Sequence, residues 1–90
     1  MKSILQKDKC CYICNTELNL ELHHIFMASN RNKSEEDGLT IYLCAKHHRG
    51  CYSPHSNRKF DLNLKEIGQE KYEETHSREE FLKRYGRSYL

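Results

Sequence analysis

Two short pairs of metal-binding side chains constrain this chain of 90 residues more than any other feature of its sequence. The first pair is C-x-x-C and the second, later in the chain, is C-x-x-H. Their four members are Cys11, Cys14, Cys44 and His47. Such spacing lets each pair present both side chains to one ion, so that two pairs complete a tetrahedral zinc site. We therefore predict a structural Zn²⁺ at these four residues.

A chain of this size would gain much of its folding stability from such an ion. With 37% hydrophobic residues and no Trp, a chain of 90 residues can bury only a thin core. A structural zinc contributes on the order of 10 kcal/mol to folding, comparable with the whole stability of a small domain. We expect one domain over residues 1–90, with a metal-containing core at 11–58 and a helical C-terminal part at 60–90.

The five cysteines are expected to be reduced. The chain has no apolar run of the ~20 residues that a membrane span requires, and its first residues lack the apolar stretch of a secretion signal. We expect an intracellular, cytoplasmic protein without a membrane partner, where thiols stay free. Clustered free thiols indicate metal ligands, with ordinary buried thiols as the alternative. Cys10 could replace Cys11 at a C-x-x-x-C spacing, but we interpret Cys10 and Cys51 as non-ligands.

Local patterns predict an α+β fold. Leucines at every second position predict a strand over 18–22, which continues into His23 and His24. The β-branched and aromatic run at 39–43 predicts a second strand, and a short helix is expected to begin near Cys44.

The segments around these strands have weaker patterns. Residues 1–9 are predicted to be a frayed lead-in or a short helix, and the polar residues 27–38 a loop with one helical turn at 34–36. From residue 60 the apolar positions follow a helical period. A last helix is predicted to begin at Ser77, which can form a capping box with the Glu three residues on, and to end at a glycine.

Four of the six histidines occur in two adjacent pairs. His23 and His24 end the first predicted strand. His47 and His48 form the other pair, and His55 follows seven residues later. A single buried histidine is usually only a hydrogen-bonded core residue. Neighbours at a strand end point to opposite faces, so one ring could bind a metal while the other stays free as a base.

These residues resemble the HNH (His-Me finger, ββα-metal) endonucleases. The similarity lies in Leu22-His23-His24-Ile25 and Leu43-Cys44-x-x-His47-His48. The pattern of the family is C-x-x-C, then [DEH]-H-[IV], then N-L-x-x-L-C-x-x-C-H. The resemblance covers residues 11–58, and the whole chain looks like the small phage-encoded members. It implies a zinc-stabilised ββα-metal domain with C-terminal helices that acts as a metal-dependent DNA endonuclease. A phage origin would imply the host cytoplasm.

Roles follow from the resemblance by position. His24 matches the general base that activates water. His23 and His48 match ligands of a catalytic divalent cation, and His47 takes the second-cysteine position of the zinc site. The resemblance thus implies catalytic roles for His23, His24 and His48, gathered around one cleft.

The chain departs from the family at two positions. The central Asn falls near Leu39; Asp37, Asn30 or Asn32 could compensate, and spacing does not choose among them. A further metal-binding histidine of some members falls at Tyr52. We predict His55 as its replacement, with neighbouring Asn57 as the alternative.

Histidine ligands favour Mn²⁺, Ni²⁺ or Zn²⁺, whereas open coordination positions keep Mg²⁺ a candidate. Arg49, Arg58 and Lys59 lie close in sequence to these histidines and are predicted to contact the DNA backbone. A solvated charged surface is the alternative for each.

The net charge is only +2, which permits nucleic acid without demanding it and is compatible with a protein partner for targeting. The alternative function is a catalytically inactive, zinc-stabilised module that binds nucleic acid or protein. The sequence leaves the oligomeric state open.

Overall fold

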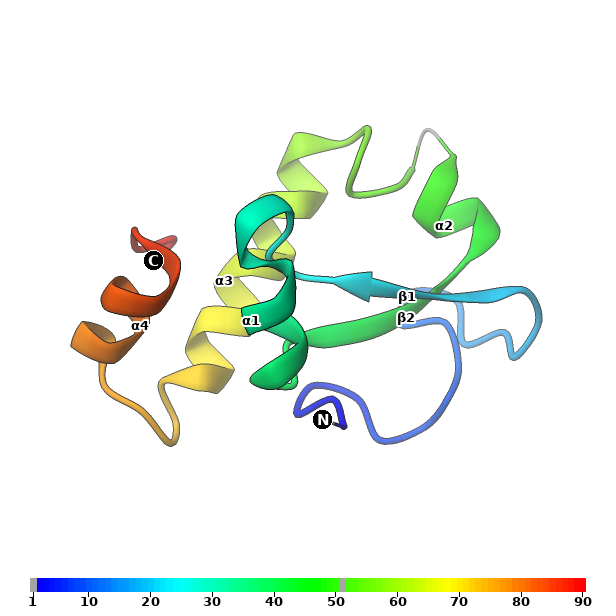
Figure 1. Ribbon diagram of the computed structural model, residues 1–90. Helices are drawn as coiled ribbons and strands as arrows, with labels where there is room; N and C mark the ends of the chain where they lie inside the picture. Colours follow the sequence, from blue (N-terminus) through cyan, green and yellow to red (C-terminus); the bar gives the residue numbers. More distant parts are fainter. Residues whose placement is uncertain (1, 51) are drawn as a thin grey trace.

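The computed structural model describes residues 2–50 and 52–90 and shows a small α+β fold (Figure 1). Its elements in chain order are β1 Leu20–His24, the 3₁₀ helix η1 Ala28–Asn30, α1 Arg31–Glu36, β2 Thr40–Cys44, α2 Ala45–Arg49, α3 Arg58–Tyr72 and α4 Arg78–Tyr85. The predicted α+β class is confirmed at this level. Within the described ranges, none of the helices is both long and apolar enough to cross a membrane.

The sheet separates the first pair of histidines. β1 and β2 are antiparallel, and their register pairs His23 with Ile41 and His24 with Thr40. Residues directly opposite each other share a face of a sheet, and successive residues of a strand alternate between faces. The side chain of His23 therefore leaves β1 on the opposite face from that of His24.

The strand predicted over 18–22 is β1, which begins at Leu20, and its alternating leucines are at most half-buried. Leu18 is 72% exposed and precedes β1, and Leu22 is 39% exposed. Asn19 adopts a left-handed conformation with φ of 53°, which turns the chain just before the strand begins. Residues 23–26 are buried instead, because the end of the strand, rather than its middle, enters the core.

The N-terminal segment is neither frayed nor helical over residues 2–9, so both alternatives predicted for it are wrong. Ile4 N donates to the carbonyl of Gly38 (2.9 Å), and Tyr42 N donates to Oε1 of Gln6 (2.8 Å). Gly38 has φ of +72°, and a Cβ there would lie 2.6 Å from the carbonyl oxygen of Lys2. The segment thus runs along the outer edge of β2 and satisfies its backbone groups.

Aromatic rings form the packed centre between β1, α3 and α4. The ring of Phe26 lies 4.5 Å from that of Tyr85 and 5.5 Å from that of Phe81, centroid to centroid. A Cβ on Gly68 would lie 3.1 Å from Cγ2 of Ile25, so a glycine lets α3 approach the end of β1 closely. We call the rings of Phe26, Tyr72, Phe81 and Tyr85 the aromatic cluster.

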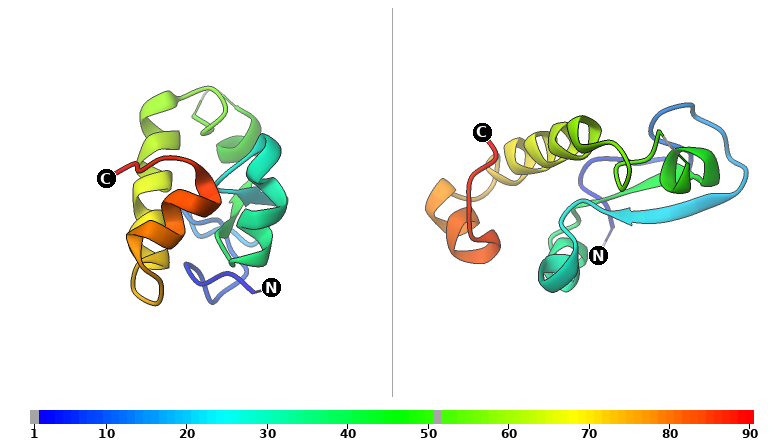
Figure 2. Two further views of the ribbon diagram at one scale, coloured as in Figure 1. Left: turned by 60° about the vertical axis from the view of Figure 1, so that its left-hand side comes forward. Right: turned by 90° about the horizontal axis from the view of Figure 1, so that it is seen from above.

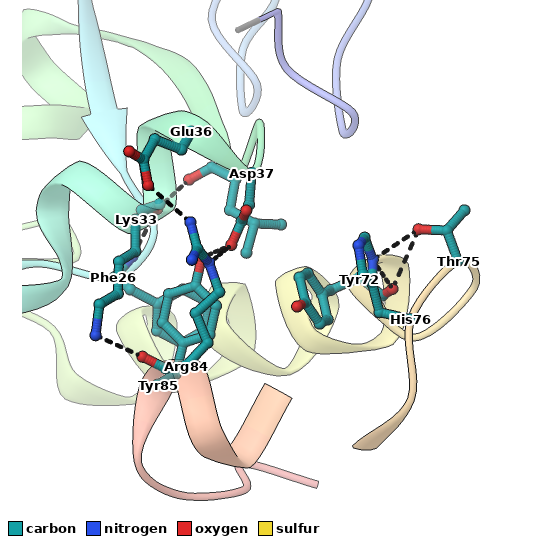
Figure 3. A network of polar contacts seen from close by, with 11 residues as sticks. Phe26, Lys33, Glu36, Asp37, Tyr72, Thr75, His76, Arg84 and Tyr85 are labelled. Atoms are coloured by element: carbon teal, nitrogen blue, oxygen red, sulfur yellow. Dashed lines mark hydrogen bonds and ion pairs between the residues drawn. The ribbon is translucent and has the colours of Figure 1, made fainter. Parts of the chain in front are cut away.

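A polar network ties α4 to the end of α1 (Figure 3). The guanidinium of Arg84 pairs with the carboxylates of Glu36 and Asp37, and the hydroxyl of Tyr85 donates to Asp37. Lys33 Nζ donates to the carbonyl of Arg84 (2.9 Å). The pKa of Tyr85 is raised by burial and by the adjacent Asp37 carboxylate. The C-terminal helix is therefore fixed by polar contacts as well as by aromatic packing.

The helix ends behave largely as their residues predicted. Ser77 accepts from the backbone N–H of Glu80 and completes a capping box, and Gly86 ends α4 with φ of 90°. α3 begins at Arg58, before the predicted residue 60, because the side chain of Asn57 caps it. The helical turn predicted at 34–36 is a longer unit made of η1 and α1.

The molecule is elongated, with extents of 37 × 25 × 20 Å. In two views α4 lies at one end of the long axis and α2 at the other, with α3 running between them (Figures 1 and 2). The aromatic cluster and α2 therefore belong to different ends of the fold.

Candidate metal centres

Four potential metal ligands meet where the loop before β1, the end of β2 and α2 come together. They are Cys11, Cys14, Cys44 and His47, and their ligand atoms all lie within 4.8 Å of one another. The two sulfurs of Cys14 and Cys44 are 3.8 Å apart, and Sγ of Cys44 is 3.2 Å from Nδ1 of His47. Zn–S bonds of about 2.3 Å give a tetrahedron with edges of about 3.8 Å. The group, hereafter the thiolate site, could hold a metal ion.

Local hydrogen bonds shape the cysteine turn of this site. Cys11 N donates to the carbonyl of Thr16, and Asn15 N donates to the carbonyl of Cys11, both at 2.8 Å. Asn15 takes a left-handed conformation with φ of 62°, which closes the turn after Cys14. Tyr12 N donates to the carbonyl of Tyr42 (2.8 Å) and joins the turn to β2. The turn thereby holds both thiols of the C-x-x-C pair close to Cys44 and His47.

The backbone around Cys11 favours the thiolate form of this residue. Burial raises the pKa of Cys11, but backbone N–H groups of Cys14, Cys44 and Ile13 outweigh it and lower this pKa to about 6. Thiolates, rather than thiols, are the ligand form. The four cysteines in the described ranges are free. Cys10 lies outside the ligand group, and Cys51 lies outside the described residues.

Three histidines form a second group beside the first. His23 on β1, His48 on α2 and His55 in the turn before α3 place their ligand atoms within 4.8 Å of one another. Ring centroids are 5.0 to 5.4 Å apart, and the Nε2 atoms of His48 and His55 are 3.2 Å apart. His23 is buried, whereas His55 is exposed. This three-histidine site is therefore open to solvent on one side and could also hold a metal ion.

The deepest histidine of this site fits a metal ligand. Nε2 of His23 is buried and has no hydrogen-bond partner among the described residues, a costly situation for a polar atom. Burial, and next the nearby His48 and His55, lower the pKa of His23 to about 3. A neutral imidazole with a free lone pair is the form that binds metals.

A carboxylate and a guanidinium flank the three-histidine site. Oε1 of Glu21 lies 2.6 Å from Nδ1 of His48. Arg49 donates from Nε to the same oxygen (3.0 Å), and its guanidinium also pairs with Oε2 of Glu21. Arg49 was predicted to contact DNA, but its charge is engaged with Glu21 although its side chain is 75% exposed.

His24 lies apart from the other three predicted histidines. Its ring is on the other face of β1, where Nε2 lies 3.5 Å from Oε1 of Glu35 on α1. A groove on this face is lined mainly by the N-terminal segment and β2. Its lining includes the exposed side chains of Lys2, Lys7 and Lys9, which the sequence had not singled out. The structure thus brings three of the four predicted histidines together and places His24 apart from them, next to Glu35.

Asp37, one of the residues that could compensate for the missing Asn, takes part in other interactions. Asp37 contacts Arg84 and Tyr85, as described above. The loop between the strands is pinned by Ser34, whose hydroxyl donates to the carbonyl of Leu39 (2.6 Å) and accepts from Phe26 N (3.2 Å). A buried serine thus bridges the end of β1 and the start of β2.

Arg58 and Lys59, the other predicted DNA contacts, are the first residues of α3. Both are exposed, and neither takes part in an ion pair within the part of the chain that the structure describes. Asn57, the alternative third ligand, caps α3 instead, since its Oδ1 accepts from Phe60 N (3.1 Å). The third position of the cleft is filled by His55.

Comparison with family models, curated proteins and solved structures found no match for this chain. The resemblance to HNH endonucleases rests on the residues themselves, and the functional assignment is a proposal.

Proposed function

We propose that the chain is a metal-dependent DNA endonuclease of the HNH type, built as a ββα-metal domain. The observation that carries the proposal is the pair of adjoining ligand groups, joined through the consecutive residues His47 and His48. Metal sites with four protein ligands are typically structural, whereas sites with three leave a position open for chemistry. One closed and one open group side by side support an enzyme that is stabilised by one ion and acts through another.

The thiolate site is proposed to bind structural Zn²⁺. Three sulfurs and one imidazole nitrogen are a usual zinc donor set. The ion would tie the turn at Cys11 and Cys14 to β2 and α2. Because an unfolded chain has no such site, the binding free energy would become folding free energy.

The three-histidine site is proposed to bind the catalytic cation, with Mn²⁺ or Ni²⁺ preferred on ligand type and Mg²⁺ as the alternative. A divalent ion there would supply positive charge to the phosphate under attack and to the leaving oxygen. His23, His48 and His55 would hold the ion, and the exposed edge at His55 would leave room for a phosphate.

His24 is proposed as the base that takes a proton from the attacking water. Its ring lies beside the carboxylate of Glu35, and such a partner orients an imidazole. His24 is the last residue of β1 and directly follows His23, so the proposal requires a phosphate at this end of the strand that reaches both faces of β1. Arg58 and Lys59 would contact neighbouring phosphates of the DNA.

The proposal is tested by nicking of supercoiled plasmid with Mg²⁺, Mn²⁺ or Ni²⁺. Wild type should cleave with at least one ion. His24→Ala should lower the rate by about 10²–10⁴-fold, the usual contribution of a general base. His76→Ala is the matched control, because His76 stacks on Tyr72 away from both sites. Folding and zinc content should stay unchanged in both variants.

The alternative function predicts a different result. A wild-type protein that is folded, carries zinc and binds DNA, yet cleaves with none of the ions, would be an inactive binding module. Cleavage that persists in His24→Ala would retain the enzyme but remove His24 as its base.

A further inference from the structure

Glu21 contacts His48 of the three-histidine site, Arg49 contacts Glu21, and the proposed function leaves both residues without a role. We infer that they form a positioning pair for His48: Glu21 fixes the imidazole for metal binding, and Arg49 fixes Glu21. Arg49 then serves the metal centre and is not a DNA backbone contact. The inference rests on the proposed metal site and adds two residues that carry no ligand atom of their own.

The strand places Glu21 at the site. Glu21 lies two residues before His23, so both side chains leave β1 on the same face. His48 reaches this face from α2, and its Nδ1 meets Oε1 of Glu21 at 2.6 Å. Glu21 and His48 are 22% and 19% exposed. A short hydrogen bond between partly buried partners has a defined geometry, unlike a contact between two mobile surface chains.

This hydrogen bond selects the ring nitrogen that faces the cleft. A carboxylate accepts only, so Nδ1 of His48 carries the proton that it donates. Nε2 is then left with its lone pair, and this atom lies 3.2 Å from Nε2 of His55. Carboxylate–histidine pairs of this kind fix the tautomer and raise the basicity of the metal-binding nitrogen.

Arg49 completes the arrangement from the solvent side. Its guanidinium meets both carboxylate oxygens of Glu21, a forked contact that fixes the plane of the carboxylate. A phosphate would have to displace Glu21 to use this charge. Arg58 and Lys59 have no such competitor among the described residues, so they are better placed to meet DNA.

Metal titration of the full chain, with zinc in the thiolate site, tests the inference without reference to cleavage. Ni²⁺ binding is measured by calorimetry in wild type, Glu21→Gln, Glu21→Asp and Arg49→Gln. Loss of an outer partner of a metal-binding histidine costs about 10–100-fold in metal affinity. We expect a loss of this size in Glu21→Gln, a smaller one in Arg49→Gln, and partial recovery in Glu21→Asp.

The controls separate positioning from simple charge or folding effects. Glu66→Gln removes an exposed carboxylate on α3 and should keep wild-type Ni²⁺ affinity. Zinc content and circular dichroism should be unchanged in every variant. Wild-type affinity in Glu21→Gln would overturn the inference. If wild type binds no second ion, both the inference and the catalytic site of the proposed function fail. If wild type cleaves DNA and Glu21→Gln has no effect, only the inference fails.

The assignment of Arg49 has its own test. DNA binding is measured against salt concentration for Arg49→Gln and Lys59→Gln, without added second metal. Each lost phosphate contact reduces the magnitude of the negative slope of log K against log[salt] by about 0.9. The slope should be unchanged in Arg49→Gln and reduced in Lys59→Gln. A reduced slope in Arg49→Gln would show that Arg49 contacts DNA and overturn its place in the pair.

Discussion

The two ends of this molecule are held together by different means. At the end that contains α2, the buried Cys11, Cys44 and His23 belong to two groups of side chains that could each hold a metal ion. At the end that contains α4, four aromatic rings and the contacts of Arg84 with Asp37 and Glu36 fix the last helix. We therefore expect a bound ion to stabilise the first end and aromatic packing to stabilise the second.

The largest expected effect tests the end with the two candidate metal sites. Cys44→Ser should cost most of the stability, because structural zinc contributes on the order of 10 kcal/mol. Circular dichroism and zinc analysis measure the loss. Cys10→Ser is the matched control and should melt like wild type, since Cys10 lies outside the ligand group. A Cys44→Ser protein that stays folded without zinc would contradict the comparison.

The next effect belongs to the aromatic cluster. Phe81→Ala should lower the free energy of unfolding by about 3–5 kcal/mol, because it empties a fully buried ring site. Urea unfolding of the zinc-loaded protein measures it. Leu82→Ala, at a neighbouring position that is 39% exposed, should change it far less. Loss of zinc from the Phe81→Ala protein would show that the two ends are not independent.

A smaller, pH-dependent effect is expected at Tyr85. Tyr85→Phe removes a donor from Asp37 and should cost about 1–3 kcal/mol at neutral pH. Burial and Asp37 raise the folded-state pKa of Tyr85 above the unfolded value of about 10. The tyrosine contribution is therefore fully present below pH of about 10 and is lost as pH rises above it. Unfolding curves of both proteins should converge at alkaline pH; a constant difference would contradict the assignment.

The smallest effect on stability is expected in His55→Ala, together with a complete loss of second-ion binding and plasmid cleavage. His55→Ala, at an exposed turn, should change the free energy of unfolding by no more than about 0.5 kcal/mol. It should nevertheless abolish binding of the second ion and plasmid cleavage. Calorimetry with Ni²⁺ and the nicking assay measure both, with His76→Ala unchanged. Cleavage that survives in His55→Ala would remove this residue from the proposed site.

Features that depend only on neighbouring residues, such as ligand spacing and helix caps, could be predicted from the sequence. The spacing of Cys11 and Cys14 forces their side chains together whatever the rest of the chain does, and the structure places both beside Cys44 and His47. Ser77 and Gly86 act through their own backbone neighbours, so the capping box and the left-handed end of α4 could be predicted locally. Such features need no knowledge of tertiary contacts.

Features that depend on distant segments could not be predicted. Glu21 and Arg49 look like solvated charges until α2 is packed against β1. The role of Ser34 depends on two strand ends meeting around it, and that of Gln6 on the free edge of β2. The alternation of leucines did not tell which face of β1 is buried, because a period of two fixes only relative orientation. One signal was available: the period also placed Glu21 on the face of His23.

Consecutive placement of His47 and His48 has a mechanical consequence. Neighbouring residues of a helix point about 100° apart, which lets one turn of α2 serve two sites at once. An inserted residue between them would swing one ring away from its partners by that same angle. Because His47 and His48 are adjacent in the same helix, the helix fixes the orientation of one candidate metal site relative to the other. A flexible connection between the two residues would remove this constraint.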